Sequence, residues 1–201
     1  AKANPGAIWE KYTYDGTGGR ATILLAGDDY HDGITLGIDK DGYLHITYDL
    51  HDEALNYRTS TSAQDVSSLS SEKSMMGTHE SGVSYMQFWN DVNGELFCAF
   101  REGGSGYGDE YMYAYDTDTT TWAYATGTST QGSFYDGDIT GTANDTNMYV
   151  SSPFIAPNNK AYFIYLKAYN SGGTTNNRKE LSFFSYDMTN GVFEKADGTD
   201  Y

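Results

Sequence analysis

A unit that recurs three times along the 201 residues restricts the fold more than any other feature of this sequence. In each copy, an apolar strand leads into a tight polar turn, and a second apolar strand and a Tyr-rich strand follow. The turns carry Asp41-Gly42, Asn93-Gly94 and Asn158-Asn159, pairs that favour the positive φ angles of a two-residue hairpin. Each copy therefore predicts a meander of three or four antiparallel strands.

The length of the repeat, roughly 50 to 65 residues, is that of one blade of a β-propeller. We expect an all-β propeller with four-stranded antiparallel blades at approximately residues 28–75, 80–125 and 145–200, within a single partial propeller over residues 1–201. Three blades form about half of a typical propeller, so the ring would need further blades or another copy to close. A different β-fold stays open as the alternative. The clearest predicted strands cover residues 21–25, 34–38, 43–48, 55–59, 83–88, 96–101, 111–115, 148–155, 161–166 and 181–186.

Two further turns resemble a degenerate Asp-box, the turn that caps blades in sialidase-like propellers. One includes Asp116 with Trp122, and the other includes Asp187 with Phe193. A plain polar β-turn packed against an aromatic side chain explains the same pattern equally well.

The composition excludes two classes of partner. The net charge is -16 with only 12 Lys and Arg residues, so the chain lacks the basic stripe that binds nucleic acid. No apolar run approaches the roughly 18 residues that span a bilayer, so we expect no membrane insertion.

The 19 Tyr residues suit half-buried sheets and carbohydrate clefts. We expect a secreted or periplasmic protein whose signal peptide is not present in this chain, with the lone Cys98 buried as an inert thiol.

Four residues with catalytic capacity stand at the ends of predicted strands: His31, His51, Tyr85 and Arg101. In a propeller, the innermost strand and the loop that leaves the second strand of a blade converge on one cleft, so the four side chains could meet. A glycine-dense loop follows Arg101 and allows backbone amides to approach a ligand. The simpler interpretation is that the histidines are surface groups and that Arg101 forms an ion pair between blades.

The local motifs around these residues resemble the repeat region of the ulvan lyases of polysaccharide lyase families 24 and 25, which are BNR-repeat proteins. The similar segments are residues 41–51, 55–58, 83–85 and 100–109, within about residues 28–165. The resemblance implies a seven-bladed propeller, about half of which lies in this chain. It also implies catalytic residues His31, Tyr85, Arg101 and His51. Met86 departs from the pattern, in which proline follows the tyrosine.

The chemistry of uronate elimination asks for these residue types. The proton on C5 becomes acidic only when the carboxylate is neutralised, and Arg101 can bind a carboxylate with two parallel hydrogen bonds. We assign His31 and Tyr85 to the acid/base pair, in either order, and His51 to neutralisation or orientation. The predicted substrate-binding residues are Arg101, His51, Tyr48, Ser105 and Tyr107. The predicted substrate is an anionic, ulvan-like polysaccharide.

No cofactor is required for this chemistry. Acidic groups such as Asp28-Asp29 and Asp136-Gly137-Asp138 could bind Ca²⁺, but neither a structural calcium site nor a zinc site can be assigned from their spacing.

Two other functions fit the sequence. A rhamnosidase-type glycoside hydrolase would need two carboxylates, and Asp32, Asp49, Glu102 and Asp109 lie near the expected site. A non-catalytic carbohydrate-binding propeller would use its Tyr and Trp residues to stack on sugars. A sialidase is disfavoured because three arginines usually hold its substrate, and this chain has four in total: Arg20, Arg58, Arg101 and Arg178.

Overall fold

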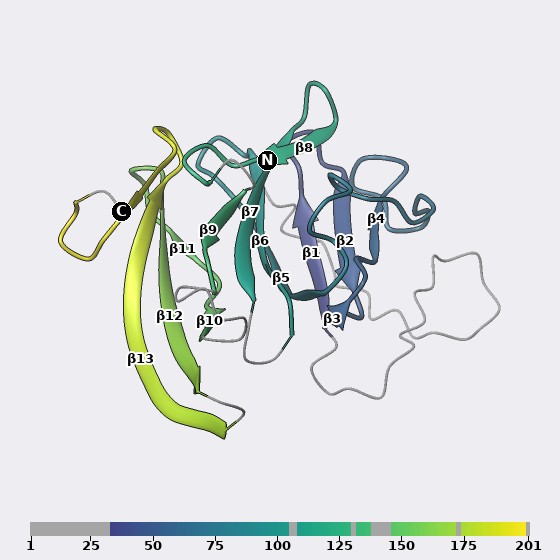
Figure 1. The fold of residues 1–201 in the computed structure, drawn as a ribbon. Helices are drawn as coiled ribbons and strands as arrows, with labels where there is room; N and C mark the ends of the chain where they lie inside the picture. Colours follow the sequence, from purple (N-terminus) through teal and green to yellow (C-terminus); the bar gives the residue numbers. More distant parts are fainter. Residues whose placement is uncertain (1–32, 105–107, 130–131, 138–145, 172–173, 200–201) are drawn as a thin grey trace, which may run out of the picture.

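Every regular element that the structure describes is a β-strand, and the strands form three antiparallel sheets that lie side by side (Figure 1). The computed structural model describes residues 33–104, 108–129, 132–137, 146–171 and 174–199. No helix occurs in these ranges, and thus none that could cross a membrane. The all-β prediction is confirmed.

The first sheet contains three strands in the order β1-β2-β4: β1 (Ile34–Ile38), β2 (Leu44–Tyr48) and β4 (Tyr57–Thr59). The turn between β1 and β2 is held by Asp39, whose Oδ1 accepts hydrogen bonds from the backbone N–H groups of Asp41 and Tyr43. Such an Asx turn explains why the Asp-Gly segment forms the predicted hairpin.

The second sheet is a four-stranded meander with one extra strand at its edge and another beside β7. Its path is β3-β5-β6-β7-β8, and β9 pairs with β7. By sequence β3 belongs to the first repeat, and β9 lies beyond residue 125, so the sheet does not follow the repeat boundaries strictly. The strands are β3 (His51–Glu53), β5 (Val83–Asn90), β6 (Leu96–Glu102), β7 (Asp109–Asp116), β8 (Thr121–Tyr124) and β9 (Ser133–Tyr135).

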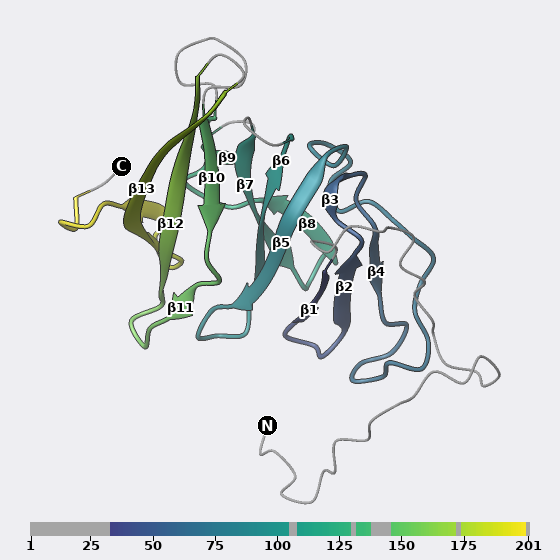
Figure 2. The same cartoon turned by 90° about the horizontal axis from the view of Figure 1, so that it is seen from below.

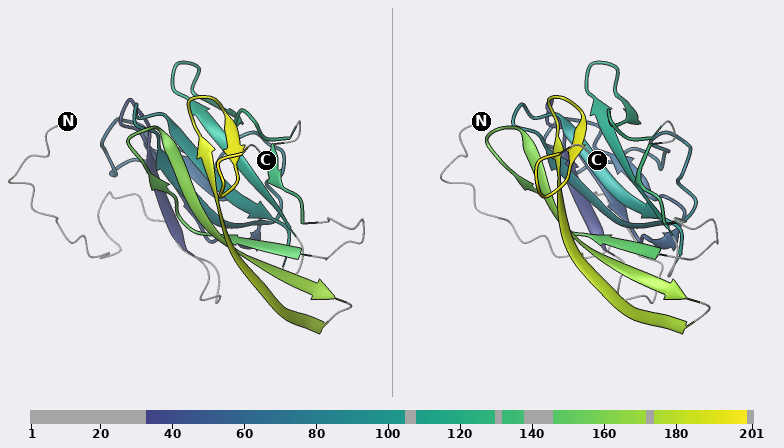
Figure 3. Two further views of the ribbon diagram at one scale, coloured as in Figure 1. Left: turned by 90° about the vertical axis from the view of Figure 1, so that its left-hand side faces the viewer. Right: turned by 60° about the vertical axis from the view of Figure 1, so that its left-hand side comes forward.

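The third sheet has the order β10-β12-β13-β14, and β11 also pairs with β12. The long β12–β13 hairpin extends past the other strands (Figure 3). The single strand expected at 148–155 is wrong, because β10 and β11 are separate and both pair with β12. Pro153 lies in the gap and cannot donate a ladder hydrogen bond. The strands are β10 (Thr146–Val150), β11 (Phe154–Ile155), β12 (Lys160–Ser171), β13 (Thr174–Asp187) and β14 (Val192–Glu194).

The core fills the two spaces between neighbouring sheets, which stand side by side when seen from below (Figure 2). Strand β6 divides its side chains between them: Leu96, Cys98 and Phe100 pack toward the first sheet, and Phe97 and Ala99 toward the third. This alternation is that of a strand buried on both faces. The outer faces of the first and third sheets carry exposed apolar side chains, as expected for an incomplete set of blades: Ile34, Leu36, Ile38, Phe154, Ile164 and Leu181.

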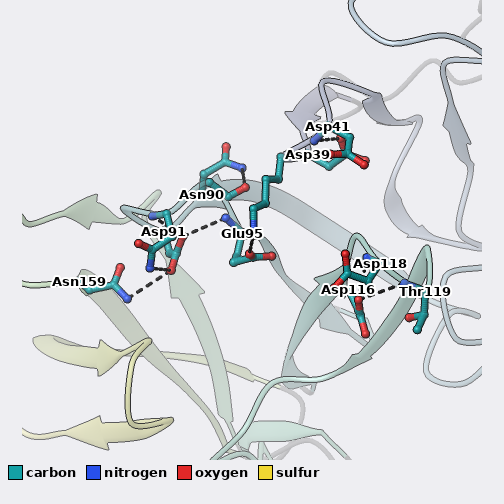
Figure 4. A network of polar contacts seen from close by, with 12 residues as sticks. Asp39, Asp41, Asn90, Asp91, Glu95, Asp116, Asp118, Thr119 and Asn159 are labelled. Atoms are coloured by element: carbon teal, nitrogen blue, oxygen red, sulfur yellow. Dashed lines mark hydrogen bonds and ion pairs between the residues drawn. The ribbon is translucent and has the colours of Figure 1, made fainter. Parts of the chain in front are cut away.

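Polar turns fasten the sheets to one another at one end of the strands (Figure 4). Asn90 donates to the carbonyl of Ile38, and Lys40 forms an ion pair with Glu95 at 2.6 Å, so the first two sheets are tied together. Asn159 bridges the second and third sheets, because its Oδ1 accepts from the N–H of Val92 and its amide donates to Asp91 and Thr189.

Polar turns form at Asp116 and Asp187, as both the Asp-box and the plain β-turn interpretation predict. Each aspartate accepts backbone N–H groups of its own turn, and each turn joins the last two strands of the meander. Both carboxyl pKa values are lowered, and hydrogen bonds within the turn favour the charged form in each case.

A buried chain of hydrogen bonds also joins the first two sheets. Trp122 Nε1 donates to the hydroxyl of Tyr57 at 3.1 Å, and this hydroxyl lies 2.6 Å from Nδ1 of His45. Nε2 of His45 lies 3.2 Å from Oδ2 of Asp39. Since an ionised carboxylate can only accept, His45 carries its proton on Nε2 and accepts at Nδ1. His45 is therefore part of the buried hydrogen-bond chain that joins the first two sheets.

Candidate functional site

A row of paired residues crosses the second sheet near one end of its strands. His51 stands opposite Ser84, Ser84 opposite Arg101, Arg101 opposite Glu110, and Glu110 opposite Tyr135. Directly opposed residues of antiparallel strands share one face of the sheet. Because Ala99 and Met112 on the same strands pack toward the third sheet, the row faces the space between the second and third sheets.

Two β-bulges direct the side chains of this row. The pairing of β5 with β6 shifts between Ser84 and Gln87, and Tyr85 within the shift has a φ of 57°. The pairing of β3 with β5 shifts beside His51, where Asp52 has a φ of 64°. A bulge re-aims a side chain, and positive φ at a bulky residue costs about 1–3 kcal/mol. The tertiary structure holds Tyr85 in this strained conformation.

The bulges bring Tyr85 and His51 together. The hydroxyl of Tyr85 lies 3.2 Å from Nε2 of His51, and the ring centres are 5.6 Å apart. A phenol and an imidazole at this distance can share or exchange a proton.

Arg101 is 2% exposed, and its guanidinium lies beside two aromatic rings that also contact each other. The guanidinium carbon lies 4.9 Å from the ring centre of Tyr85 and 5.4 Å from that of Tyr149. Among the described residues, Nε and Nη1 of Arg101 have no hydrogen-bond partner. A buried cation with unsatisfied donors is costly, so these N–H groups are suited to receive an anionic ligand.

The absence of a side chain at Gly108 leaves room for the aliphatic part of Arg101. The φ of Gly108 is 154°, and a Cβ at this position would lie 2.9 Å from both Cγ and Cδ of Arg101. Any larger residue would displace the arginine.

A cavity of about 180 Å³ adjoins this cluster between the second and third sheets, and its lining includes Tyr85, Gln87, Glu110 and Tyr149. Glu110 is 4% exposed. Burial raises the pKa of its carboxyl to about 8, against the opposing effect of the Arg101 charge. A larger cavity of about 330 Å³ lies elsewhere between these sheets, but its lining is mainly aromatic and contains none of the predicted catalytic residues.

Three of the four predicted catalytic residues, His51, Tyr85 and Arg101, are therefore brought together. His31, Ser105 and Tyr107 lie outside the described residues. Tyr48 belongs to the first sheet, where its hydroxyl donates to Glu72 and accepts from Arg58. The substrate-binding role of Tyr48 stays a prediction.

Sequence reasoning missed Tyr149 and Glu110. Tyr149 begins the third repeat much as Tyr85 stands near the start of the second, and that equivalence was a usable signal. Glu110 was visible as a charged residue within a Tyr-rich strand, but only the exact strand register places it opposite Arg101.

The carboxylates that a hydrolase would use have other partners. Glu102 accepts from Ser81 and lies 3.0 Å from Nδ1 of His79, and Asp109 accepts from the N–H of Gly137 and the hydroxyl of Tyr111. Asp32 lies outside the described residues. Within the described ranges, no three His, Cys, Asp or Glu side chains form a group that could hold a metal ion.

The fold and the site define a class of protein: a partial propeller in which a buried arginine and a histidine both contact one tyrosine. The family model described as "BNR repeat-containing family member" matches residues 2–201. The chain belongs to this BNR repeat-containing family. No curated protein matches the sequence.

Solved structures of polysaccharide lyases share the fold. An ulvan lyase of family PL25 is 16% identical with a TM-score of 0.67, over 86% of this chain and 42% of that chain. A PL25 ulvan lyase bound to -[GlcA(1-4)Rha3S]- is 15% identical with a TM-score of 0.67, over the same shares of the two chains. The polysaccharide lyase Uly1 is 17% identical with a TM-score of 0.65, over 84% of this chain and 43% of that chain.

This chain thus spans less than half the length of these lyases. At such identity the likeness establishes the fold, and the expected partial propeller of the ulvan lyase kind is confirmed.

Proposed function

We propose that this chain carries the active site of a polysaccharide lyase that cleaves an ulvan-like, sulfated, uronate-containing polysaccharide by β-elimination. The supporting observation is the buried guanidinium of Arg101, whose Nε and Nη1 have no hydrogen-bond partner in the described part of the chain and which lies beside the Tyr85–His51 pair. The fold shared with ulvan lyases, one of them bound to a glucuronate-containing fragment, supports the same choice.

In the proposed reaction, Arg101 binds the uronate carboxylate and stabilises the negative charge that develops when the C5 proton leaves. The base takes this proton, the C4–O bond breaks, and the acid protonates the departing oxygen. Tyr85 acts as one member of the acid/base pair, and His31 is proposed as the other. His51 orients the Tyr85 hydroxyl and helps to neutralise the substrate.

The remaining features of the proposal follow from this chemistry. Ser105, Tyr107 and Tyr48 are proposed substrate-binding residues, and elimination needs no cofactor. Further blades or another copy would complete the ring around the site. Because the polymer is too large to enter a cell, the protein would act after export.

Ultraviolet absorbance tests the proposal. Elimination creates a C4–C5 double bond conjugated to the carboxylate, so incubation with ulvan should raise the absorbance at the short-wavelength end of the ultraviolet, and Tyr85→Phe should abolish the rise. Tyr43→Phe, which changes an exposed tyrosine of the first sheet, is the matched control and should leave the rise intact. New reducing ends without the absorbance would show hydrolysis instead and reject the lyase.

A further inference from the structure

Glu110 is a buried acid next to Arg101, whose positive charge the proposed reaction uses to bind the uronate carboxylate. It stands directly opposite Arg101 in the β6–β7 ladder and on the same face, and it lines the cavity that Tyr85 and Tyr149 also line. If Glu110 were ionised, its negative charge would offset that of Arg101 in a poorly solvated site, and a uronate carboxylate would be held less well.

Four neighbouring strands each place a titratable or charged side chain near Glu110. Arg101 faces it from β6, Tyr135 stands opposite it on β9, and Tyr85 and Tyr149 share its cavity from β5 and β10. Asp109 precedes it on β7 and acts on it through its charge. Arg101 is the cation of this set, so the protonation of Glu110 decides the net charge beside it.

We propose that Glu110 is a positioning residue that gives the site its preference for anionic sugars: it is neutral when uronate is bound, and binding above neutral pH draws a proton onto it. The inference rests on the proposed function, because it assumes that Arg101 receives the uronate carboxylate.

The linkage follows from the charges. Burial raises the pKa of Glu110 to about 8, and the Arg101 charge is the influence that lowers it. A bound carboxylate cancels much of that positive charge, so the pKa of Glu110 rises further in the complex. At pH 8 the Glu110 carboxyl is about half protonated in the free protein and fully protonated in the complex. The linkage therefore predicts uptake of about half a proton for each bound uronate.

Isothermal titration calorimetry in two buffers of different ionisation enthalpy measures this uptake. The probe is a glucuronate–rhamnose 3-sulfate tetrasaccharide, titrated into the Tyr85→Phe chain so that the sugar is not cleaved while the aromatic ring beside Arg101 is kept. We expect about half a proton per site at pH 8, and a dissociation constant about tenfold higher at pH 9 than at pH 7. A carboxyl-reduced tetrasaccharide should bind weakly and take up no proton.

Variants separate this role from a structural one. Glu110→Gln in the same chain should bind with similar affinity at pH 7 and lose both the proton uptake and the pH dependence. Glu95→Gln, which changes a carboxyl next to the opposite end of β6 that pairs with Lys40, is the matched control and should keep both.

The outcomes are distinguishable. Binding without proton uptake in the chain that retains Glu110, or uptake that persists in Glu110→Gln, overturns the inference and leaves the lyase proposal standing. Failure of the tetrasaccharide to bind at any pH overturns both. The proton count with Glu110 present remains decisive even if the glutamine variant does not fold.

Discussion

The hydroxyl of Tyr85 and Nε2 of His51 lie 3.2 Å apart although 34 positions separate the two residues in the chain. The contact depends on β3 leaving the first repeat to pair with β5 of the second sheet. Two successive repeats of the sequence therefore contribute to one tyrosine–histidine pair within the second sheet.

Replacing His51 should impair the reaction without unfolding the protein. His51→Ala removes the partner that orients the Tyr85 hydroxyl, and we expect a loss of about 10²-fold in kcat, the usual cost of misplacing a catalytic group by about 1 Å. The rate of absorbance increase with ulvan measures it. His79→Ala is the control, because His79 pairs with Glu102 and stacks on Tyr111. Equal losses in the two variants would argue against a special role for His51.

Gly108→Ala should disable Arg101 indirectly. The new methyl group would lie 2.9 Å from two carbons of the arginine side chain and from the backbone oxygen of Glu102. We expect KM to rise at least tenfold because the guanidinium moves from its place beside the Tyr85 and Tyr149 rings. Gly77→Ala introduces similar backbone strain at a φ of 80° but meets no atom within 4 Å. It should cost about 1–2 kcal/mol of stability, the penalty of an L-residue in the left-handed region, and leave KM unchanged.

Tyr57→Phe should destabilise the interface between the first two sheets. The change leaves Nε1 of Trp122 without its acceptor and Nδ1 of His45 without its donor, both in a buried setting. Each orphaned group costs about 1–3 kcal/mol. Urea denaturation measures the loss, with the exposed Tyr43→Phe as the control. A midpoint that stays where it was would mean that the hydrogen-bond chain contributes nothing to stability.

Stability should fall in mild acid because of His45. Burial lowers the pKa of His45, although Asp39 opposes the effect, so the folded state holds the ring neutral while the unfolded chain protonates it near the ordinary value of about 6.5. The free energy of unfolding therefore decreases as pH falls below about 6.5, until the folded-state pKa is passed. Denaturation midpoints between pH 5 and 8 measure this, and the slope should flatten in His45→Gln. A slope unchanged by the substitution would assign the acid sensitivity to other groups.

The sequence was most informative where local chemistry decides the structure. The hairpins at Asp41-Gly42 and Asn93-Gly94 formed where turn residues demanded them, with Asp39 and Asp91 capping the turns through their carboxylates. The meeting of Tyr85, His51 and Arg101 was predictable because equivalent positions of repeated blades approach the same cleft.

Pairing between strands that are distant in the chain was harder to predict from the sequence. Nothing local marks the three residues of β3 as a strand of the neighbouring sheet, because a bulge leaves no period-two pattern. The role of Glu110 depends on register, since a shift of one residue would place its side chain on the opposite face. Pro153 was a local signal against a continuous strand at 148–155.

The row of paired residues that crosses the second sheet forms only when its strands pair in the native register. The proposed activity requires Ser84 to stand opposite Arg101 and Arg101 opposite Glu110, so a chain whose strands slip by one position would turn the arginine to the other face. Such a chain could still be compact and rich in β-structure. Specific activity would then report the fraction of molecules with native strand alignment, a quantity that spectroscopic measures of secondary structure do not resolve.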